Sequence, residues 1–159
     1  MDRFDHSVGQ VCHLCFRMHR FHAETPRGWD AENKDRLNSI TGAVIEAAIE
    51  IHSALGPGLL ESVYEVLLFS ALVNRGFLVE RQKSITFEFK GVVFQGGFTP
   101  DLIVEHAVVV EIKAKERNSL VFERQVNTYL KILDLRVGLV INFGLPTLKE
   151  GIRRVVNNF

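Results

Sequence analysis

The chain has 159 residues, the length of one ordinary domain. Its hydrophobic fraction of 47%, charged fraction of 24% and net charge of zero argue against a protein that coats nucleic acid in bulk, although they leave room for a local basic groove. No apolar run is long enough to span a bilayer, so no membrane partner is expected. Two cysteines and the lack of an apolar signal core favour a cytoplasmic location.

Residues 1–37 show no sustained hydrophobic period, and we expect a poorly ordered extension before a domain that spans residues 38–159. The extension contains side chains of the types that bind zinc: Cys12, Cys15, His19 and His22. Only three residues separate the cysteine pair from the histidine pair, whereas a zinc finger has about twelve. Solvated tail residues are therefore the preferred interpretation, with a zinc site as the alternative.

Two helices are predicted at the start of the domain. Apolar side chains repeat at helical spacing from about Asn38 to Leu55, and Gly56-Pro57-Gly58 then ends the helix, because the residue before a proline disfavours helical geometry. A second helix follows and is expected to end at Gly76. The expected inner face of this second helix carries Leu60, Val63, Tyr64, Leu67 and Ala71.

The rest of the chain is predicted to contain strands and two further helices. The expected strands cover residues 79–80, 85–90, 92–98 and 136–142, together with a hairpin over 101–113. Helices are expected over residues 120–133 and 149–157. Strands that lie between helices, with a buried strand late in the chain, predict a layered α/β fold.

The hairpin brings charged residues together. If it folds about His106, residues whose numbers sum to 212 face each other, and Asp101 lies opposite Glu111 with its Cβ roughly 5 Å away. Lys113 shares the face of Glu111, because side chains alternate along a strand. Like charges directly opposite one another destabilise a sheet, and a divalent cation between them would remove the conflict.

These residue types suit a magnesium site for phosphodiester hydrolysis. Asp101, Glu111 and the backbone carbonyl of Ile112 are the candidate ligands, since Mg²⁺ prefers oxygen donors and keeps several waters. Lys113 would orient the attacking water or stabilise charge on the phosphate. The alternative is an exposed hairpin end with a salt bridge. The flanking apolar residues Val108 to Val110 favour a functional site, because charges are rarely buried without a partner.

Two helical residues are further candidates. Glu61 falls at the edge of the apolar stripe of its helix, on the side of Leu68 and Leu72, and either reaches the metal or favours the positive helix N-terminus. Gln125 shares an otherwise apolar face with Tyr129. Its amide either orients Lys113 or a bound water, or it is a core amide whose hydrogen bonds are satisfied.

Basic residues also cluster around the third helix and near the chain end, interleaved with acidic ones: Lys113, Lys115, Arg117, Arg124, Lys131, Arg153 and Arg154.

The same residues carry a resemblance to known families. Pro100-Asp101 followed by Glu111-Ile112-Lys113 resembles the signature of the PD-(D/E)XK nuclease superfamily, and the segment from Gly58 to Tyr64 resembles the motif of its GxxExxY proteins. The resemblance covers roughly residues 38–159. It implies a restriction-endonuclease-like α/β core, in which a mixed central sheet is flanked by helices. It also implies a site built from Glu61, Asp101, Glu111 and Lys113.

A second motif adds supporting residues to that site. Gln125 and Tyr129 are similar to the Gln-x-x-x-Tyr motif of RecB-like nucleases, and Tyr64 belongs to the GxxExxY motif, so the resemblance places these three beside the catalytic residues. The expected function is Mg²⁺-dependent hydrolysis of phosphodiester bonds in DNA, with Mn²⁺ as a substitute. The alternatives are a non-catalytic nucleic-acid-binding or interaction module and a hydrolase of another phosphoester. A homodimer or a protein partner also stays open.

Overall fold

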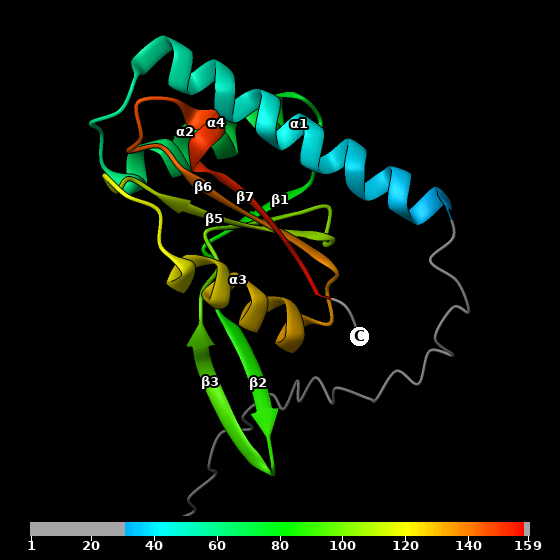
Figure 1. Ribbon diagram of the computed structural model, residues 1–159. Coiled ribbons are helices and arrows are strands. Elements are labelled where there is room, and N and C mark those ends of the chain that lie inside the picture. The colour runs from blue at the N-terminus through cyan, green and yellow to red at the C-terminus, as the bar shows by residue number, and fades with distance from the viewer. Residues whose placement is uncertain (1–30, 158–159) are drawn as a thin grey trace, which may run out of the picture.

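The computed structural model describes residues 31–157, and these form four helices and seven strands (Figure 1). In chain order the elements are α1 (Ala31–Leu55), α2 (Glu61–Asn74), β1 (Val79–Arg81), β2 (Ile85–Phe89), β3 (Val92–Phe98), β4 (Leu102–Val104), β5 (Val108–Lys113), α3 (Leu120–Leu133), β6 (Val137–Asn142), α4 (Leu148–Gly151) and β7 (Ile152–Val156). Cys12, Cys15, His19 and His22, the residues of the alternative zinc site, lie outside the described residues. No helix within residues 31–157 has both the length and the apolarity to cross a bilayer.

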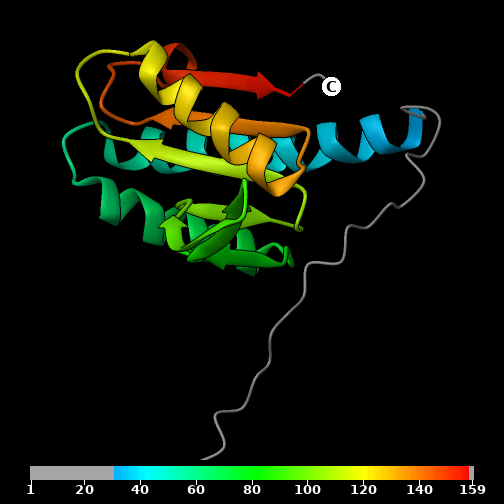
Figure 2. The ribbon, with the colours of Figure 1, turned by 90° about the horizontal axis from the view of Figure 1, so that it is seen from below.

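A five-stranded mixed sheet forms the centre of the fold. Its strand order is β1-β4-β5-β6-β7, with β5 and β6 parallel and the other neighbours antiparallel. Figures 1 and 2 show α1 and α2 on one face of the sheet and α3 on the other. Each face therefore has its own hydrophobic core: a larger one under α1, α2 and α4, and a smaller one under α3. This arrangement confirms the predicted layered α/β fold.

The central strands are buried on both faces, as expected of apolar runs covered by helices on each side. Every residue of β6 is buried, and so is every residue of β5 except Lys113. Along β5, Val108, Val110 and Ile112 pack into the larger core, whereas Val109 packs under α3. Because side chains alternate along a strand, Glu111 also lies on the α3 face.

The predicted hairpin register is confirmed. Leu102 pairs with Val110 and Val104 with Val108, so the paired residue numbers sum to 212. The connection is a three-residue loop, Glu105 to Ala107, in which Glu105 and His106 have positive φ values of 54° and 51°. Asp101 stands one step beyond the last pair, which brings it to the end of β5.

The first helix begins earlier than predicted. It starts at Ala31 rather than near Asn38, so residues 31–37 of the N-terminal extension belong to this helix. Residues 31–36 are exposed, and the first buried residue of the helix is Leu37. An apolar period therefore starts only after the helix itself has begun.

The second helix ends as predicted but presents a different face. Gly76, with φ of 87°, lies two residues beyond the end of α2. Leu60 and Val63 were expected inside, yet their exposed fractions are 73% and 39%. The buried residues of the helix are Tyr64, Glu65, Leu68 and Leu72. The inner face is thus rotated toward the side on which Glu61 was predicted to lie.

The predicted helix over residues 149–157 is wrong. A single helical turn, α4, ends at Gly151, and β7 then pairs antiparallel with β6 along the open edge of the sheet. Gly151 permits this close approach, because a Cβ there would collide with the carbonyl oxygen of Asn142. Ile152, Val155 and Val156 fit helical spacing as well as strand pairing, so their pattern alone does not separate the two structures.

Strands β2 and β3 form a separate antiparallel ribbon that projects from the body of the molecule (Figure 1). Its turn lies at Lys90 and Gly91, with φ values of 52° and 80°, which confirms the predicted turn.

The third helix also has the predicted bounds of 120–133. Ser119 caps it, with its Oγ accepting a hydrogen bond from the amide of Val121 at 3.3 Å.

Candidate active site

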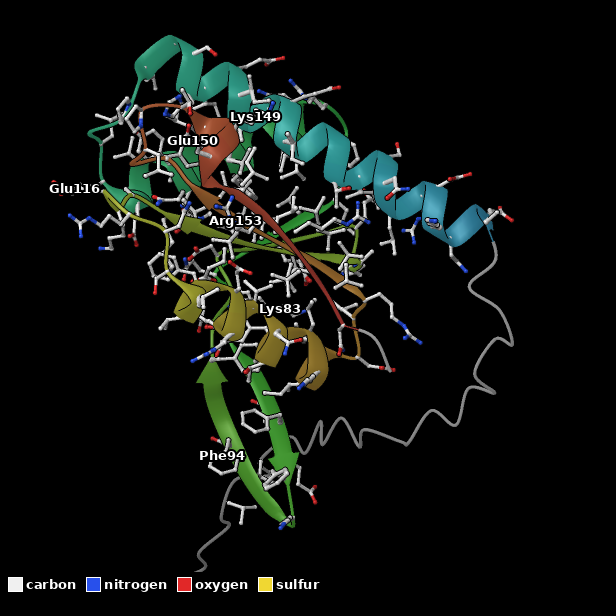
Figure 3. The ribbon with its side chains drawn as sticks, viewed as in Figure 1. Lys83, Phe94, Glu116, Lys149, Glu150 and Arg153 are labelled. Carbon is white, nitrogen blue, oxygen red and sulfur yellow. The ribbon has the colours of Figure 1, made fainter. Side chains whose placement is uncertain are left out.

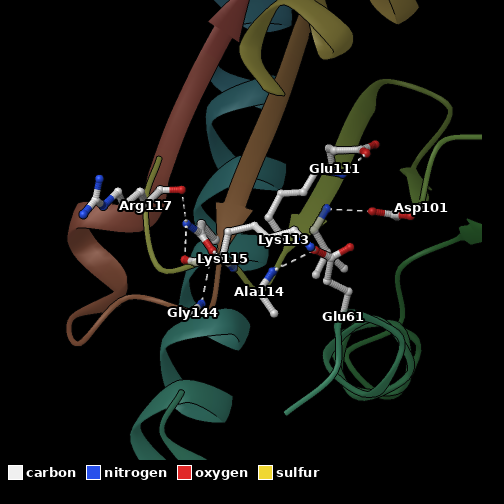
Figure 4. A network of polar contacts seen from close by, with 10 residues as sticks. Glu61, Asp101, Glu111, Lys113, Ala114, Lys115, Arg117 and Gly144 are labelled. Atoms are coloured by element: carbon white, nitrogen blue, oxygen red, sulfur yellow. Dashed lines mark hydrogen bonds and ion pairs between the residues drawn. The ribbon is translucent and has the colours of Figure 1, made fainter. Parts of the chain in front are cut away.

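Asp101 is held at the end of β5 by hydrogen bonds to both carboxylate oxygens. Its Oδ2 accepts from the amide of Ile112 at 2.7 Å (Figure 4), and its Oδ1 accepts from Nε2 of Gln82 at 3.0 Å. The backbone N–H of Gln82 also donates to the backbone carbonyl of Asp101 at 3.0 Å. Burial raises the pKa of Asp101 above its usual value, although the hydrogen bond from Ile112 opposes the shift. The carboxylate is thus fixed in position before any ligand binds.

Gln82 and Glu65 also belong to this site, although neither was predicted from the sequence. Nε2 of Gln82 donates to Oε2 of Glu65 at 2.8 Å as well as to Asp101, so it bridges the two carboxylates. Glu65 is 8% exposed, and burial raises its pKa. Glu65 lies on the buried face of α2, which differs from the face that was predicted to be buried. Gln82 lies in a polar connection without a hydrophobic period, which gives no signal in the sequence.

Glu111 is the most deeply buried charged residue of the site, with an exposed fraction of 3%. Its Oε1 accepts a hydrogen bond from Nζ of Lys113 at 2.6 Å, whereas its Oε2 has no hydrogen-bond partner among the described residues. Burial, reinforced by the nearby charge of Asp101, raises the pKa of Glu111 to about 7. A buried carboxylate oxygen without a partner is costly, and a cation would satisfy it.

Lys113 supplies the positive charge of the site. Burial alone would lower the pKa of its ammonium, but the hydrogen bond and charge of Glu111, with the charges of Asp101 and Glu61, raise it overall. Its Nζ also lies 5.5 Å from the ring centroid of Phe122 on α3. The ammonium therefore stays charged and partly shielded on the α3 side of the sheet.

Glu61 is the first residue of α2 and reaches the segment that follows β5. Its Oε1 accepts a hydrogen bond from the amide of Ala114 at 3.2 Å and lies 3.3 Å from Nζ of Lys115 (Figure 4). Among residues 31–157, no three acidic, histidine or cysteine side chains form a cluster that could hold a metal alone. Glu61 therefore does not complete a trio of direct ligands with Asp101 and Glu111 in this arrangement.

Gln125 and Tyr129 are paired with each other on α3. Nε2 of Gln125 donates to the hydroxyl of Tyr129 at 2.7 Å, a contact that differs from the expected one with Lys113. Burial raises the pKa of Tyr129, and the charge of Glu111 also raises it. The two α3 residues thus line the site on the side opposite α2.

Tyr64 holds the connection that precedes α2. Its hydroxyl donates to the carbonyl of Gly56 at 2.6 Å and accepts from the amide of Leu59 at 3.2 Å. Its ring stacks on Phe143, with centroids 4.3 Å apart. Tyr64 therefore fixes the approach to Glu61 through these contacts.

Asn142, which was not predicted as a site residue, holds the segment after β5. It is fully buried and stands opposite Lys113 in the β5–β6 ladder. Its Oδ1 accepts from the amide of Lys115 and its Nδ2 donates to the carbonyl of the same residue, both at 2.9 Å.

A pocket of about 410 Å³ opens beside this segment and is lined by Leu59, Leu60, Glu61, Ser62, Ala114 and Lys115.

The donor set fits a hard divalent cation. Asp101 and Oε2 of Glu111 offer carboxylate oxygens, and the unpartnered Oε2 is the observation that points to a ligand. The amide of Ile112 faces Asp101, and the carbonyl of a strand residue points to the same edge as its amide, so the carbonyl of Ile112 is a third candidate. Oxygen donors of this kind suit Mg²⁺ or Mn²⁺, and two carboxylates suffice for Mg²⁺ because it retains waters.

Comparisons with known proteins show the family of this chain. The model of a family described as the PD-(D/E)XK nuclease superfamily matches residues 38–155. No curated protein matches the chain. A similar solved structure is described as the crystal structure of SSO0001, with 17% identity and a TM-score of 0.46, and the match covers 80% of this chain. The chain spans 62% of the length of that protein.

Proposed function

Because the chain belongs to the PD-(D/E)XK nuclease superfamily, we propose that it is a metal-dependent nuclease that uses Mg²⁺ to hydrolyse phosphodiester bonds in DNA. Its mixed sheet between helices is a restriction-endonuclease-like fold. The observation that carries the proposal is the unpartnered Oε2 of Glu111, which is buried beside Asp101 and Lys113. The salt bridge to Lys113 engages only Oε1, whereas a bound cation would also satisfy Oε2.

In this proposal Asp101, Glu111 and the carbonyl of Ile112 hold the metal. The ion, when bound, supplies an acidified water and neutralises negative charge on the phosphate. Gln82 and the amide of Ile112 keep Asp101 oriented through the hydrogen bonds described above. Preorganised ligands of this kind cost little reorganisation when substrate arrives.

Lys113 is the proposed catalytic cation. Its ammonium is already charged and lies 2.6 Å from Oε1 of Glu111, so it can donate to a phosphate oxygen or orient a water at the same place. Gln125 and Tyr129 form a polar pair beside it and are proposed to position the ammonium or the attacking water. The proposed role of Glu61 is indirect: it fixes the amide of Ala114 and would reach the metal through a water.

We further propose that the chain belongs to the GxxExxY branch of the superfamily. The motif runs from Gly58 through Glu61 to Tyr64, and its residues have connected roles in the structure. Tyr64 binds the carbonyl of Gly56 and the amide of Leu59, while Glu61 binds the segment after β5. The motif thus supports a connection between the start of α2 and the end of β5.

A cleavage assay tests the proposal. Labelled single- and double-stranded DNA and RNA are incubated with the protein in Mg²⁺, Mn²⁺ or EDTA. Lys113→Ala is the test variant, and Lys131→Ala, on the exposed side of α3, is the matched control. We expect metal-dependent cleavage of DNA by the parent and the control, and a loss of about a hundredfold or more in Lys113→Ala. Cleavage that persists in EDTA, or an absence of cleavage on every substrate, would contradict the proposal.

A further inference from the structure

The β2–β3 ribbon exposes an apolar surface that the fold leaves uncovered. Within the described residues the two strands pair only with each other. Phe89, Val92 and Phe94 have exposed fractions of 61%, 55% and 43%. Figure 3 shows Phe94 on the projecting part of the ribbon, away from the helices and the five-stranded sheet. Exposed aromatic residues gathered on one element indicate a binding surface.

The phenylalanines near the tip of the ribbon occupy one face. Phe87 pairs with Phe94 across the strands, and Phe89 pairs with Val92. Because side chains alternate along a strand, these four residues share a face, which we call the aromatic face. Thr86, Glu88, Val93 and Gln95 alternate with them and lie on the opposite face. The ribbon is therefore two-sided even though no core covers it.

The aromatic face continues as a row of rings toward the candidate active site. The rings of Phe94 and Phe87 stack with centroids 5.0 Å apart, and Phe87 lies 6.0 Å from Phe98. Phe98 in turn stacks on Tyr129 at 4.4 Å. Gly97 makes room for this row, because a Cβ there would lie 2.5 Å from the ring of Phe87.

The row ends at the residues proposed to act on the phosphodiester. Tyr129 accepts the hydrogen bond of Gln125, and Phe98 precedes Asp101 by three residues along the chain. A cation stands at each end: Nζ of Lys90 lies 5.5 Å from the ring centroid of Phe89 at the ribbon turn, and Lys113 lies in the site. Proteins that bind single-stranded nucleic acid combine aromatic rings, on which bases stack, with positive charges that contact the phosphates.

We propose that the aromatic face of the β2–β3 ribbon is a stacking platform for the unpaired bases of a DNA strand that enters the Asp101–Glu111–Lys113 site. The inference rests on the proposed nuclease function and specifies that the substrate strand is unpaired where it enters the site. A duplex keeps its base faces stacked on one another, so only unpaired bases can lie on the row of rings. The continuity of the row with the site favours this occupant over a second copy of the chain.

Binding measured without catalysis tests the platform separately from the nuclease. The anisotropy of a short fluorescent oligodeoxythymidine is followed in EDTA, where a metal-dependent enzyme does not cut. We expect Phe94→Ala to weaken binding about fivefold or more, since truncating a stacking aromatic has effects of this order. Val92→Ala should also weaken it. Val93→Ala is the matched control, because Val93 is 57% exposed on the opposite face of the same ribbon.

A second variant guards against loss of folding. Phe94→Trp keeps a stacking ring and is expected to bind like the parent, with a new tryptophan fluorescence that single-stranded DNA quenches. The parent, whose one tryptophan is Trp29, supplies the background signal. Circular dichroism and light scattering on each variant establish its folding and its mass.

The outcomes separate the two proposals. Single-stranded binding that depends on Phe94, with little binding of a duplex of the same length, supports the platform even if no cleavage is found. The platform is overturned if the parent does not bind single strands in EDTA, or if Phe94→Ala binds as well as the parent. A parent dimer that Phe94→Ala converts to a folded monomer would also overturn it, because the face would then be an interface between copies.

Discussion

At the scale of single residues, Glu111 concentrates the electrostatic conflict of the site. Its side chain is buried, Asp101 lies near it, and only one of its carboxylate oxygens has a partner among the described residues. Lys113 offsets part of this cost through a 2.6 Å contact. The cost that remains raises the pKa of Glu111 to about 7, so the folded protein favours the protonated form of this carboxyl.

The raised pKa predicts how the stability of the metal-free protein depends on pH. The folded state holds a proton on Glu111 up to about pH 7, whereas the unfolded chain releases it near 4.5. The contribution of Glu111 to stability is therefore fully present below about 4.5 and is lost as the pH rises to about 7. The shift corresponds to about 3 kcal/mol, which we expect to appear as a fall in the free energy of unfolding.

Glu111→Gln tests this pH dependence by urea denaturation between pH 4.5 and 8. Gln cannot ionise, so the variant should match the parent at low pH and be more stable at pH 8 by about 1–3 kcal/mol. Glu116→Gln, at an exposed position, is the control and should follow the parent throughout. A parent whose difference from Glu111→Gln is constant over this range would show that the carboxyl is not destabilised by burial.

At the scale of elements, the tight β4–β5 hairpin positions Asp101. Its turn places two non-glycine residues, Glu105 and His106, in the left-handed region. Such backbone conformations cost L-residues roughly 1 kcal/mol each. The amide of Ala107 donates to the carbonyl of Val104 at 3.0 Å, which closes the turn and sets the register.

Replacing one turn residue tests this strain. His106→Gly should raise the free energy of unfolding by about 0.5–1 kcal/mol, because glycine adopts φ > 0 without a Cβ penalty. The loss of the exposed contact between His106 and Glu80 subtracts little. His106→Ala keeps the Cβ and loses the same contact, so it should not stabilise. Equal stabilities of the two variants in thermal unfolding would contradict a strained turn.

The sequence predicts elements well where a local pattern and the tertiary contacts agree. In β4 and β5 the alternation of apolar residues and a hairpin folded about His106 specify one register, which the structure confirms. In α3, Ser119 marks the start of the helix and a single apolar face sets its orientation. Asp101, Glu111 and Lys113 come together because the register of one local hairpin is enough to join them.

Prediction fails where a distant partner decides the structure. The free edge of β6 converts residues 152–156 into a strand, although their spacing also suits a helix. Leu60 and Val63 are apolar but exposed, because the packing of α2 on the sheet selects Tyr64 and Leu68 instead. Gln82 reaches Asp101 across 19 positions of sequence and belongs to no periodic pattern.

At the scale of the whole molecule, the site lies where α2, β4, β5 and α3 meet at one end of the sheet. The two cores hold these elements from opposite faces, so the carboxylates are supported by packing on both sides. The ribbon extends the same site outward through Phe98 and Tyr129. The fold therefore combines a rigid, buried charge cluster with an exposed aromatic surface beside it.

The most direct test of this account is the melting temperature of the metal-free protein at pH 8 with and without Mg²⁺ or Mn²⁺. Binding to the folded state alone should raise the melting temperature of the parent by about 5 °C or more at saturating metal. Glu111→Gln should begin at a higher melting temperature and respond little, while Glu116→Gln should respond like the parent. A parent that neither metal stabilises, or a Glu111→Gln variant that responds as fully as the parent, would contradict a metal site at Asp101 and Glu111.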